Sequence, residues 1–127
     1  MTINKRLQII SRCSYAEYAL SLLAGHEVLA CEGEEDYEGS ACILAERTTA
    51  EGFYTYLFLT WSWGSCDYCD DWQARQLTGD EIIEEMRRSL ALFETREQTI
   101  AFLLPTYKNG SCSFNAWLKQ QQEEEVR

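Results

Sequence analysis

Cys66 and Cys69 are the residues best suited to chemistry, because two cysteines separated by two residues can hold one metal ion on a tight turn. A structural zinc site needs about four ligands. The chain has no second pair of this kind and a single histidine, so the spacing predicts an incomplete site that needs further ligands. The predicted metal ligands are Cys66, Cys69, Asp70 and Cys112, with Cys31 and His26 as other candidates and zinc as the cofactor they would hold.

Two other interpretations of this cysteine turn stay open. In the first, the pair is a redox dithiol that follows a strand, as in thioredoxin-like sites. The aspartates at positions 67, 70 and 71 oppose this interpretation, because a reactive thiol needs nearby positive charge to stabilise its thiolate. The same carboxylates would help to bind a cation. In the second, the thiols only pack beneath Trp63 and Trp72, and the aspartates cap a short helix that follows.

The composition predicts one folded domain spanning residues 1–127, since 46% of the residues are hydrophobic and proline and glycine are few. Residues 1–6 lead into an amphipathic pattern and no run approaches membrane-spanning length, so we expect a cytoplasmic protein without a membrane segment. Free thiols are the norm in the cytosol. Cys13 and Cys42 are therefore expected to be small core residues.

The net charge of −10 disfavours direct binding of nucleic acid, which depends on cationic side chains that displace counterions. An acidic chain can instead present a negative surface to a basic protein partner. The densest negative segments are the loop from residue 32 to 38 and the cysteine turn, while two tyrosines of the strongest strand offer an aromatic surface. The predicted partner-binding residues are Glu32, Glu34, Glu35, Asp36, Glu38, Asp67, Asp70, Asp71, Tyr54 and Tyr56.

The elements that must position these residues begin with two short helices in the first 25 residues. Ser14 and Glu17 have the spacing of a capping box, and Gly25 is placed to end the second helix in the left-handed conformation. Strands are predicted at 28–30, 40–46 and 53–63, the last two joined in a hairpin. The third strand has apolar side chains on both faces, with Tyr54 and Tyr56 on one of them, so both faces should be covered.

Helices dominate the second half. Capping boxes at Thr78 and Thr95 open two of them, the first continuing to Phe93 and the second stopping at Pro105. A final helix is expected from residue 114 to about 125. The pattern predicts an α+β fold in which a small antiparallel sheet of about three strands packs with several short helices. The expected core residues are Phe53, Leu57, Leu59, Trp61, Ile82, Ile83, Met86, Leu90 and Leu103.

Three short motifs carry a resemblance to a known group of proteins. They are Asp-Tyr-Glu-Gly-Ser at 36–40, Gly-Ser-Cys-x-x-Cys-Asp at 64–70 and Ala-Phe-Leu at 101–103. Over residues 36–104 the chain resembles small uncharacterised proteins of phages and bacterial mobile elements, although its residues between the cysteines are bulkier and more acidic. The resemblance implies a setting in the host cell cytosol, where small acidic proteins bind and block host defence machinery.

Three classes of function follow from these patterns. The leading hypothesis is a non-enzymatic binding protein, encoded by a phage, that inhibits a host defence or nucleic-acid-handling complex through its acidic surface. No Ser-His-Asp order or phosphate-binding glycine loop supports an enzyme. The alternatives are a metal- or thiol-dependent protein centred on Cys66 and Cys69, and a pocket that sequesters a small molecule. The side chains expected to line such a pocket are Trp61, Trp63, Tyr54 and Tyr56.

Overall fold

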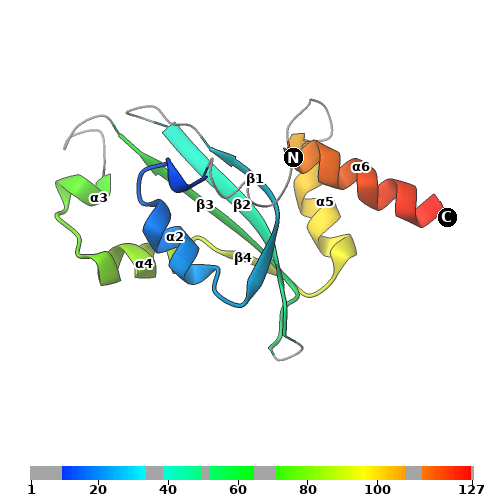
Figure 1. Ribbon diagram of the computed structural model, residues 1–127, viewed down its shortest axis with the longest axis horizontal. Coiled ribbons are helices and arrows are strands. Elements are labelled where there is room, and N and C mark those ends of the chain that lie inside the picture. The colour runs from blue at the N-terminus through cyan, green and yellow to red at the C-terminus, as the bar shows by residue number, and fades with distance from the viewer. Residues whose placement is uncertain (1–9, 34–38, 50–51, 65–70, 108–112, 127) are drawn as a thin grey trace.

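A four-stranded antiparallel sheet lies between two groups of helices in the computed structural model (Figure 1). The structure describes residues 10–33, 39–49, 52–64, 71–107 and 113–126. The strand order is β1-β2-β3-β4. The strands are β1 (His26–Gly33), β2 (Gly39–Arg47), β3 (Tyr56–Trp63) and β4 (Ala91–Phe93). The predicted α+β fold is confirmed, with four strands rather than about three.

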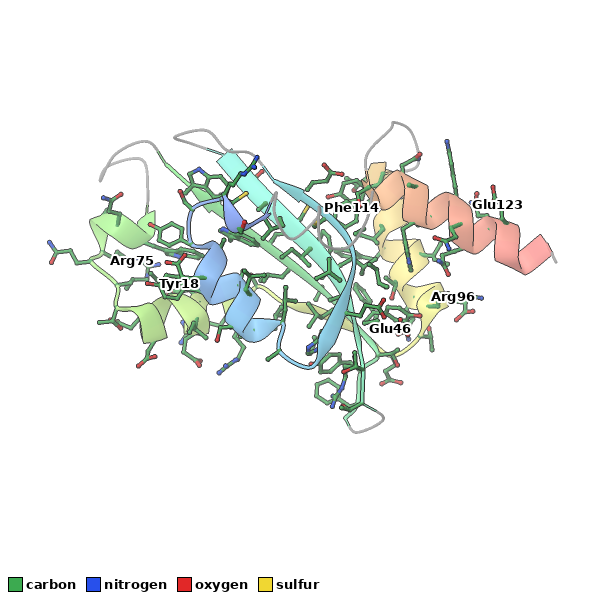
Figure 2. The ribbon with its side chains drawn as sticks, in the orientation of Figure 1. Tyr18, Glu46, Arg75, Arg96, Phe114 and Glu123 are labelled. Carbon is green, nitrogen blue, oxygen red and sulfur yellow. The ribbon has the colours of Figure 1, made fainter. Side chains whose placement is uncertain are left out.

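Five helices are described, and they cover both faces of the sheet. One group is α2 (Ala16–Leu22), α3 (Asp71–Ala74) and α4 (Gly79–Arg88). The other is α5 (Arg96–Tyr107) and α6 (Ser113–Val126). Figure 2 shows Tyr18 of α2 and Phe114 of α6 on opposite sides of the sheet. None of the helices in these described ranges is long and apolar enough to cross a bilayer.

The strands alternate between two hydrophobic clusters. In β2, Ile43 belongs to the cluster beneath α2 and α4, whereas its neighbour Leu44 belongs to the cluster beneath α5 and α6. In β3, Leu59 and Phe58 divide in the same way. Such alternation follows from the period of two in an extended strand. The central strands are therefore buried on both faces, which confirms the prediction made for the third strand.

The third strand was predicted to start at residue 53, and this start is wrong. Phe53 was expected in the core, but it is 72% exposed, because β3 begins only at Tyr56 and Phe53 lies in the turn before it. Tyr54 also precedes β3 and packs against the α2/α4 cluster, so it does not share the face of Tyr56. Other predicted core residues are buried, namely Leu57, Leu59, Trp61, Ile82, Met86 and Leu103, while Ile83 and Leu90 are half-buried.

Helix α2 does not start with the predicted capping box. Its N-cap is Tyr15, which has a left-handed φ of 66° and no side-chain capping bond. The Ser14 carbonyl instead accepts a hydrogen bond of 2.7 Å from the indole N–H of Trp61, so the segment before α2 is fixed by the sheet. Gly25 has the predicted left-handed φ, +78°, in the turn between α2 and β1, although α2 itself ends at Leu22.

Helix α4 begins with the predicted capping box but is shorter than predicted. Thr78 and Glu81 bond to each other's backbone amides, and α4 ends at Arg88 rather than continuing to Phe93. The residues at 91–93 form strand β4 instead, paired with residues 56–58 of β3. The edge of β3 overrides the helical periodicity, because pairing with it satisfies backbone groups that the end of a helix would leave open.

The predicted stop at Pro105 is also wrong, since Pro105 lies inside α5, which continues to Tyr107. Proline removes one amide donor near the end of the helix. The last carbonyl is secured from outside the helix, because the Asn115 amide donates to the Tyr107 carbonyl at 2.9 Å. The start of α5 is as predicted, with reciprocal bonds between Thr95 and Gln98, and α6 covers the predicted final helix.

Candidate functional site

The predicted metal site cannot be placed, since Cys66, Cys69, Asp70 and Cys112 lie outside the described residues. Within the described ranges, no three histidine, cysteine or acidic side chains are gathered so that they could hold a metal ion. Cys13, Cys31 and Cys42 are free thiols. The first two are buried in the α2/α4 cluster, so Cys31 packs there rather than facing a site. Zinc binding by the cysteine turn stays a prediction.

Most of the predicted acidic partner surface also falls outside the described part of the chain. Glu34, Glu35, Asp36, Glu38, Asp67 and Asp70 are not described, and Asp71 is placed only as the first residue of α3. Glu32 is described, and its carboxylate accepts a hydrogen bond from the amide of Ser113, the first residue of α6. The Ser113 hydroxyl in turn accepts from the Cys31 amide at 3.2 Å. Glu32 therefore ties α6 to β1, a role that the sequence did not predict.

A groove of about 860 Å³ lies at the end of the sheet where β1 finishes and β2 begins. Its floor is made by cross-strand pairs, with Ser40 opposite Ser62 and Cys42 opposite both Glu32 and Thr60. The described groove lining contains two carboxylates and no basic side chain. The lining residues are Glu32, Gly33, Ser40, Ala41, Cys42, Thr60, Trp61, Ser62, Trp63, Trp72, Glu85, Ser89 and Tyr107.

The groove exists because the residues on one face of β2 and β3 change from apolar to polar along the strands. Leu44 and Phe58 are buried under α5 and α6, whereas the pair Cys42 and Thr60 comes next along the same face. The terminal residue of α5, Tyr107, has its hydroxyl 3.8 Å from the Cys42 sulfur. The groove thus begins where the helical cover of this face ends, and its floor is hydroxyl-rich.

Two carboxylates stand side by side at the opposite end of the sheet. Glu27 of β1 is directly opposite Glu46 of β2, and Glu46 is in turn opposite Tyr56 of β3, which is opposite Phe93 of β4. We call these four residues the Glu27–Phe93 row. Among the described residues, neither carboxylate has an ion pair. Like charges directly opposite one another destabilise a sheet, so this arrangement has a local cost.

The sequence did not predict this row. Glu27 and Glu46 are separated by 19 positions in the chain, and only the register of β1 against β2 brings them together. That register passes through a bulge between Val28 and Ala30, which shifts the pairing by one residue. Since a one-residue shift moves a side chain to the other face, a strand pattern alone could not reveal the pair.

The four aromatic residues predicted to form a small-molecule pocket do not line one pocket, although two of them, Trp61 and Trp63, border the groove. Trp61 and Trp63 are buried in the α2/α4 cluster, and Tyr56 packs on the other face of the sheet, where its ring lies 6.3 Å from that of Trp117. Tyr54 is at the hairpin end, where its ring stacks on His26 with centroids 5.9 Å apart. That version of the pocket is therefore wrong.

His26 makes two polar contacts at this end of the sheet. Its Nδ1 lies 3.0 Å from the Ala24 carbonyl, which can only accept, so Nδ1 carries the proton in the neutral ring. Nε2, 3.0 Å from the Tyr54 hydroxyl, then accepts the phenolic proton. The Arg47 guanidinium lies over the Tyr54 ring at 4.8 Å. The Ala24 contact lies just beyond the end of α2, and the sequence did not predict the tyrosine partner.

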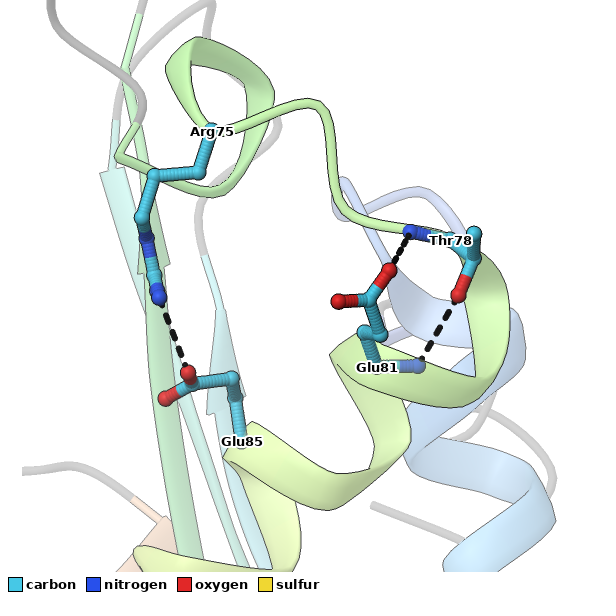
Figure 3. A network of polar contacts seen from close by, with 4 residues as sticks. All are labelled: Arg75, Thr78, Glu81 and Glu85. Atoms are coloured by element: carbon cyan, nitrogen blue, oxygen red, sulfur yellow. Dashed lines mark hydrogen bonds and ion pairs between the residues drawn. The ribbon is translucent and has the colours of Figure 1, made fainter.

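One carboxyl group of the described surface has a shifted pKa. The Thr78 backbone amide, followed by the Thr78 hydroxyl contact and the nearby Arg75 charge, lowers the pKa of Glu81 below its ordinary value. Figure 3 shows this capping box beside the ion pair of Arg75 with Glu85, in which the guanidinium nitrogen and carboxylate oxygen are 3.0 Å apart. Both contacts stabilise the start of α4 and its junction with α3. They need no ligand to explain them.

No protein-family model, no curated protein and no solved structure matches this chain.

Proposed function

We propose that this chain is a non-enzymatic binding protein that docks its acidic surface on a basic protein. The observation that carries the proposal is the pairing of Glu27 with Glu46. Their mutual repulsion lowers stability by about 0.2–1 kcal/mol, judged from cross-strand pairs in general. A cationic side chain of a partner would relieve this repulsion, so the pair is better suited to the bound state than to the free one.

The aromatic rings next to the two carboxylates indicate which cationic side chain the partner presents. Tyr56 is next to Glu46 in the row, and both are half-buried. An arginine can donate two parallel hydrogen bonds to a carboxylate and also stack on an aromatic ring. The Glu27–Phe93 row offers both kinds of contact within one strand spacing. The partner is therefore expected to present arginine, and the net charge of −10 supports its attraction over longer distances.

The resemblance to proteins of phages and mobile elements suggests which basic proteins are relevant. Host complexes that handle nucleic acids need basic grooves, because phosphate neutralisation supplies much of their affinity. An acidic protein that covers such a groove would act as an inhibitor in the host cytosol without any catalytic step. Direct binding of nucleic acid by this chain is opposed by its own charge.

The experiment compares two charge-matched double variants. Partners are captured from host lysate at low salt, and association and dissociation rates are measured for the purified complex over a range of salt concentrations. Glu27→Gln with Glu46→Gln should slow association about threefold to tenfold at low salt and flatten its salt dependence. Glu17→Gln with Glu84→Gln, which changes exposed glutamates of α2 and α4, is the control and should have a smaller effect.

A second measurement needs no partner. Glu27→Gln with Glu46→Gln should leave the melting temperature unchanged or raise it, because the variant removes a repulsion. Association that is independent of salt, or equally slowed by the control variant, would refute docking through the Glu27–Phe93 row.

A further inference from the structure

The edge of β3 is only partly paired. Strand β4 pairs with residues 56–58, but β3 continues to Trp63, so in the described part of the chain five residues of β3 extend beyond this pairing. Figure 1 shows β3 continuing past the end of β4 toward α3. An unpaired strand edge presents backbone donors and acceptors that can pair with another chain.

The direction of the backbone groups follows from one hydrogen bond. The Ser89 hydroxyl, just before β4, lies 3.1 Å from the Thr60 carbonyl, so this carbonyl points away from β2. In an antiparallel strand the N–H and C=O of one residue point to the same side, and this direction alternates along the strand. The N–H and C=O groups of Thr60 and Ser62 therefore both point outward.

The contact with the Ser89 hydroxyl satisfies the hydrogen-bonding capacity of the Thr60 carbonyl only in part. The same hydroxyl lies 2.8 Å from the Met86 carbonyl, which is nearer than the Thr60 carbonyl. A serine hydroxyl has one proton, so it cannot donate fully to both carbonyls. The outward groups of β3 thus retain hydrogen-bonding capacity that an incoming backbone could use.

The groove described above surrounds this edge. It is lined from one face of β3 by Thr60 and Ser62 and from the other face by Trp61 and Trp63, both of which are buried. Because side chains of an added strand alternate between the two faces of the sheet, a groove that is open on both faces of an edge strand suits an extended peptide.

The charge of the groove indicates the composition of that peptide. Glu32 and Glu85 line it, and no described lining side chain is basic. Each carboxylate uses Oε1 in its internal contact, Glu32 with the Ser113 amide and Glu85 with Arg75. A carboxylate has about four acceptor positions on its two oxygens, so each can also accept from an added ammonium or guanidinium group.

We propose that the β3 edge from Thr60 to Ser62 binds an extended, positively charged segment of a partner protein as an additional strand of the sheet. This inference is independent of the proposed docking through the Glu27–Phe93 row, because that row lies at the opposite end of β1 and β2. Backbone hydrogen bonds would supply affinity, and the two carboxylates, one on each side of the sheet, would favour a segment that carries lysine or arginine.

The probe is a synthetic peptide of alternating lysine and valine, six residues long and blocked at both ends. It should bind isotope-labelled protein and shift the amide signals of Thr60 and Ser62 most strongly. Two matched peptides are the controls. A glutamate–valine peptide should bind at least about tenfold more weakly because of its charge. A lysine–valine peptide with every backbone nitrogen methylated should also lose about tenfold in affinity, because its backbone can no longer donate hydrogen bonds.

Two protein variants test the same edge. Ser62→Pro removes the outward amide, whereas Ser62→Ala keeps it, and residue 62 is exposed, so neither change alters the buried core. Ser62→Pro should weaken peptide binding about tenfold relative to Ser62→Ala. Circular dichroism and melting curves establish that both variants fold. If Ser62→Pro does not fold, the methylated peptide tests the backbone hydrogen bonds without any protein variant.

Four results would overturn the inference. They are equal binding of the methylated peptide, equal binding of the acidic peptide, unchanged binding by folded Ser62→Pro, and a dimer of this chain that Ser62→Pro dissociates, which would assign the edge to a second copy. Peptide binding should be unaffected by Glu27→Gln with Glu46→Gln. If the peptide does not bind the β3 edge, the proposed docking through the Glu27–Phe93 row is unaffected. If that docking is refuted, the proposed peptide binding at the β3 edge is unaffected.

Discussion

At the scale of single residues, Thr78 and Glu81 have the clearest sequence signal and a defined consequence for stability. The Thr78 amide donates to the Glu81 carboxylate at 3.1 Å, and the Glu81 amide donates to the Thr78 hydroxyl at 3.3 Å. The first of these bonds favours the ionised carboxylate and so lowers the pKa of Glu81 in the folded state. Spacing alone was sufficient here, because the capping box is closed within four consecutive residues.

The lowered pKa predicts how stability depends on pH. A carboxyl group that binds its proton less readily when folded contributes fully above its unfolded pKa. This contribution is lost as the pH falls through that pKa and then through the lowered, folded one. Glu81→Gln keeps a side-chain acceptor for the Thr78 amide but has no charge to titrate. Its melting temperature should therefore fall less than that of the unaltered protein between about pH 6 and pH 3.

The control for this pH measurement is Thr78→Ser, which keeps the hydroxyl and should retain the original pH profile. Identical profiles for the unaltered protein and Glu81→Gln would contradict the assignment of the shift to this capping box.

At the scale of helices and strands, the junction between β1 and α6 depends on a contact across more than 80 positions. Glu32 accepts from the Ser113 amide, one of the donors that the start of a helix leaves open. The negative carboxylate also interacts favourably with the positive end of the helix dipole. Glu32 was predicted to bind a partner because it belongs to a run of acids, and such a run does not reveal a contact with a residue 81 positions away.

Replacing Glu32 should loosen α6. Glu32→Ala leaves the half-buried Ser113 amide without its acceptor, and we expect a loss of about 1–2 kcal/mol in the free energy of unfolding. Glu32→Gln, which still offers a carbonyl oxygen, should lose less. Urea denaturation gives the free energy, and hydrogen exchange of the first amides of α6 locates the change. Glu27→Ala, on the exposed start of the same strand, is the matched control. Equal effects of the two alanine variants would disprove the anchoring role.

The elements predicted correctly are those with signals that are local in the chain. The capping boxes at Thr78 and Thr95 and the two apolar faces of β3 needed no knowledge of distant residues. The failures involve distant partners. Strand β4 was taken as helix because its apolar residues continue the stripe of α4, and the stop at Pro105 ignored the cap provided by Asn115. Tertiary contacts decide these cases against local preference.

At the scale of the whole molecule, the candidate sites could not be predicted from the sequence, because they too depend on contacts between residues that are distant in the chain. The groove takes its residues from β1, β2 and β3 and from the helices around them, and the Glu27–Phe93 row takes one residue from each strand. Both depend on register, which the bulge in β1 alters. The sequence correctly indicated a two-sided sheet, but it could not indicate which polar residues on that sheet face one another.

The two hydrophobic clusters share one sheet, and this predicts a single cooperative unfolding transition. Ile43 and Leu44 are adjacent in β2 and fully buried, yet each packs in a different cluster. Ile43→Ala and Leu44→Ala should each lower the free energy of unfolding by about 2–5 kcal/mol, a large part of the typical stability of a small domain. Since both clusters are built on the same strands, neither can unfold while the other stays intact.

Tryptophan fluorescence can follow the two clusters separately. In Trp117→Phe the remaining indoles, at 61, 63 and 72, report on the α2/α4 side, whereas Trp117 lies in the α5/α6 cluster. Urea midpoints from fluorescence and from circular dichroism should coincide in this variant and should shift together when either Ile43→Ala or Leu44→Ala is added. Two separated transitions, each sensitive to only one of these alanine substitutions, would mean that the sheet does not couple its two faces. The expected single domain over residues 1–127 would then be wrong.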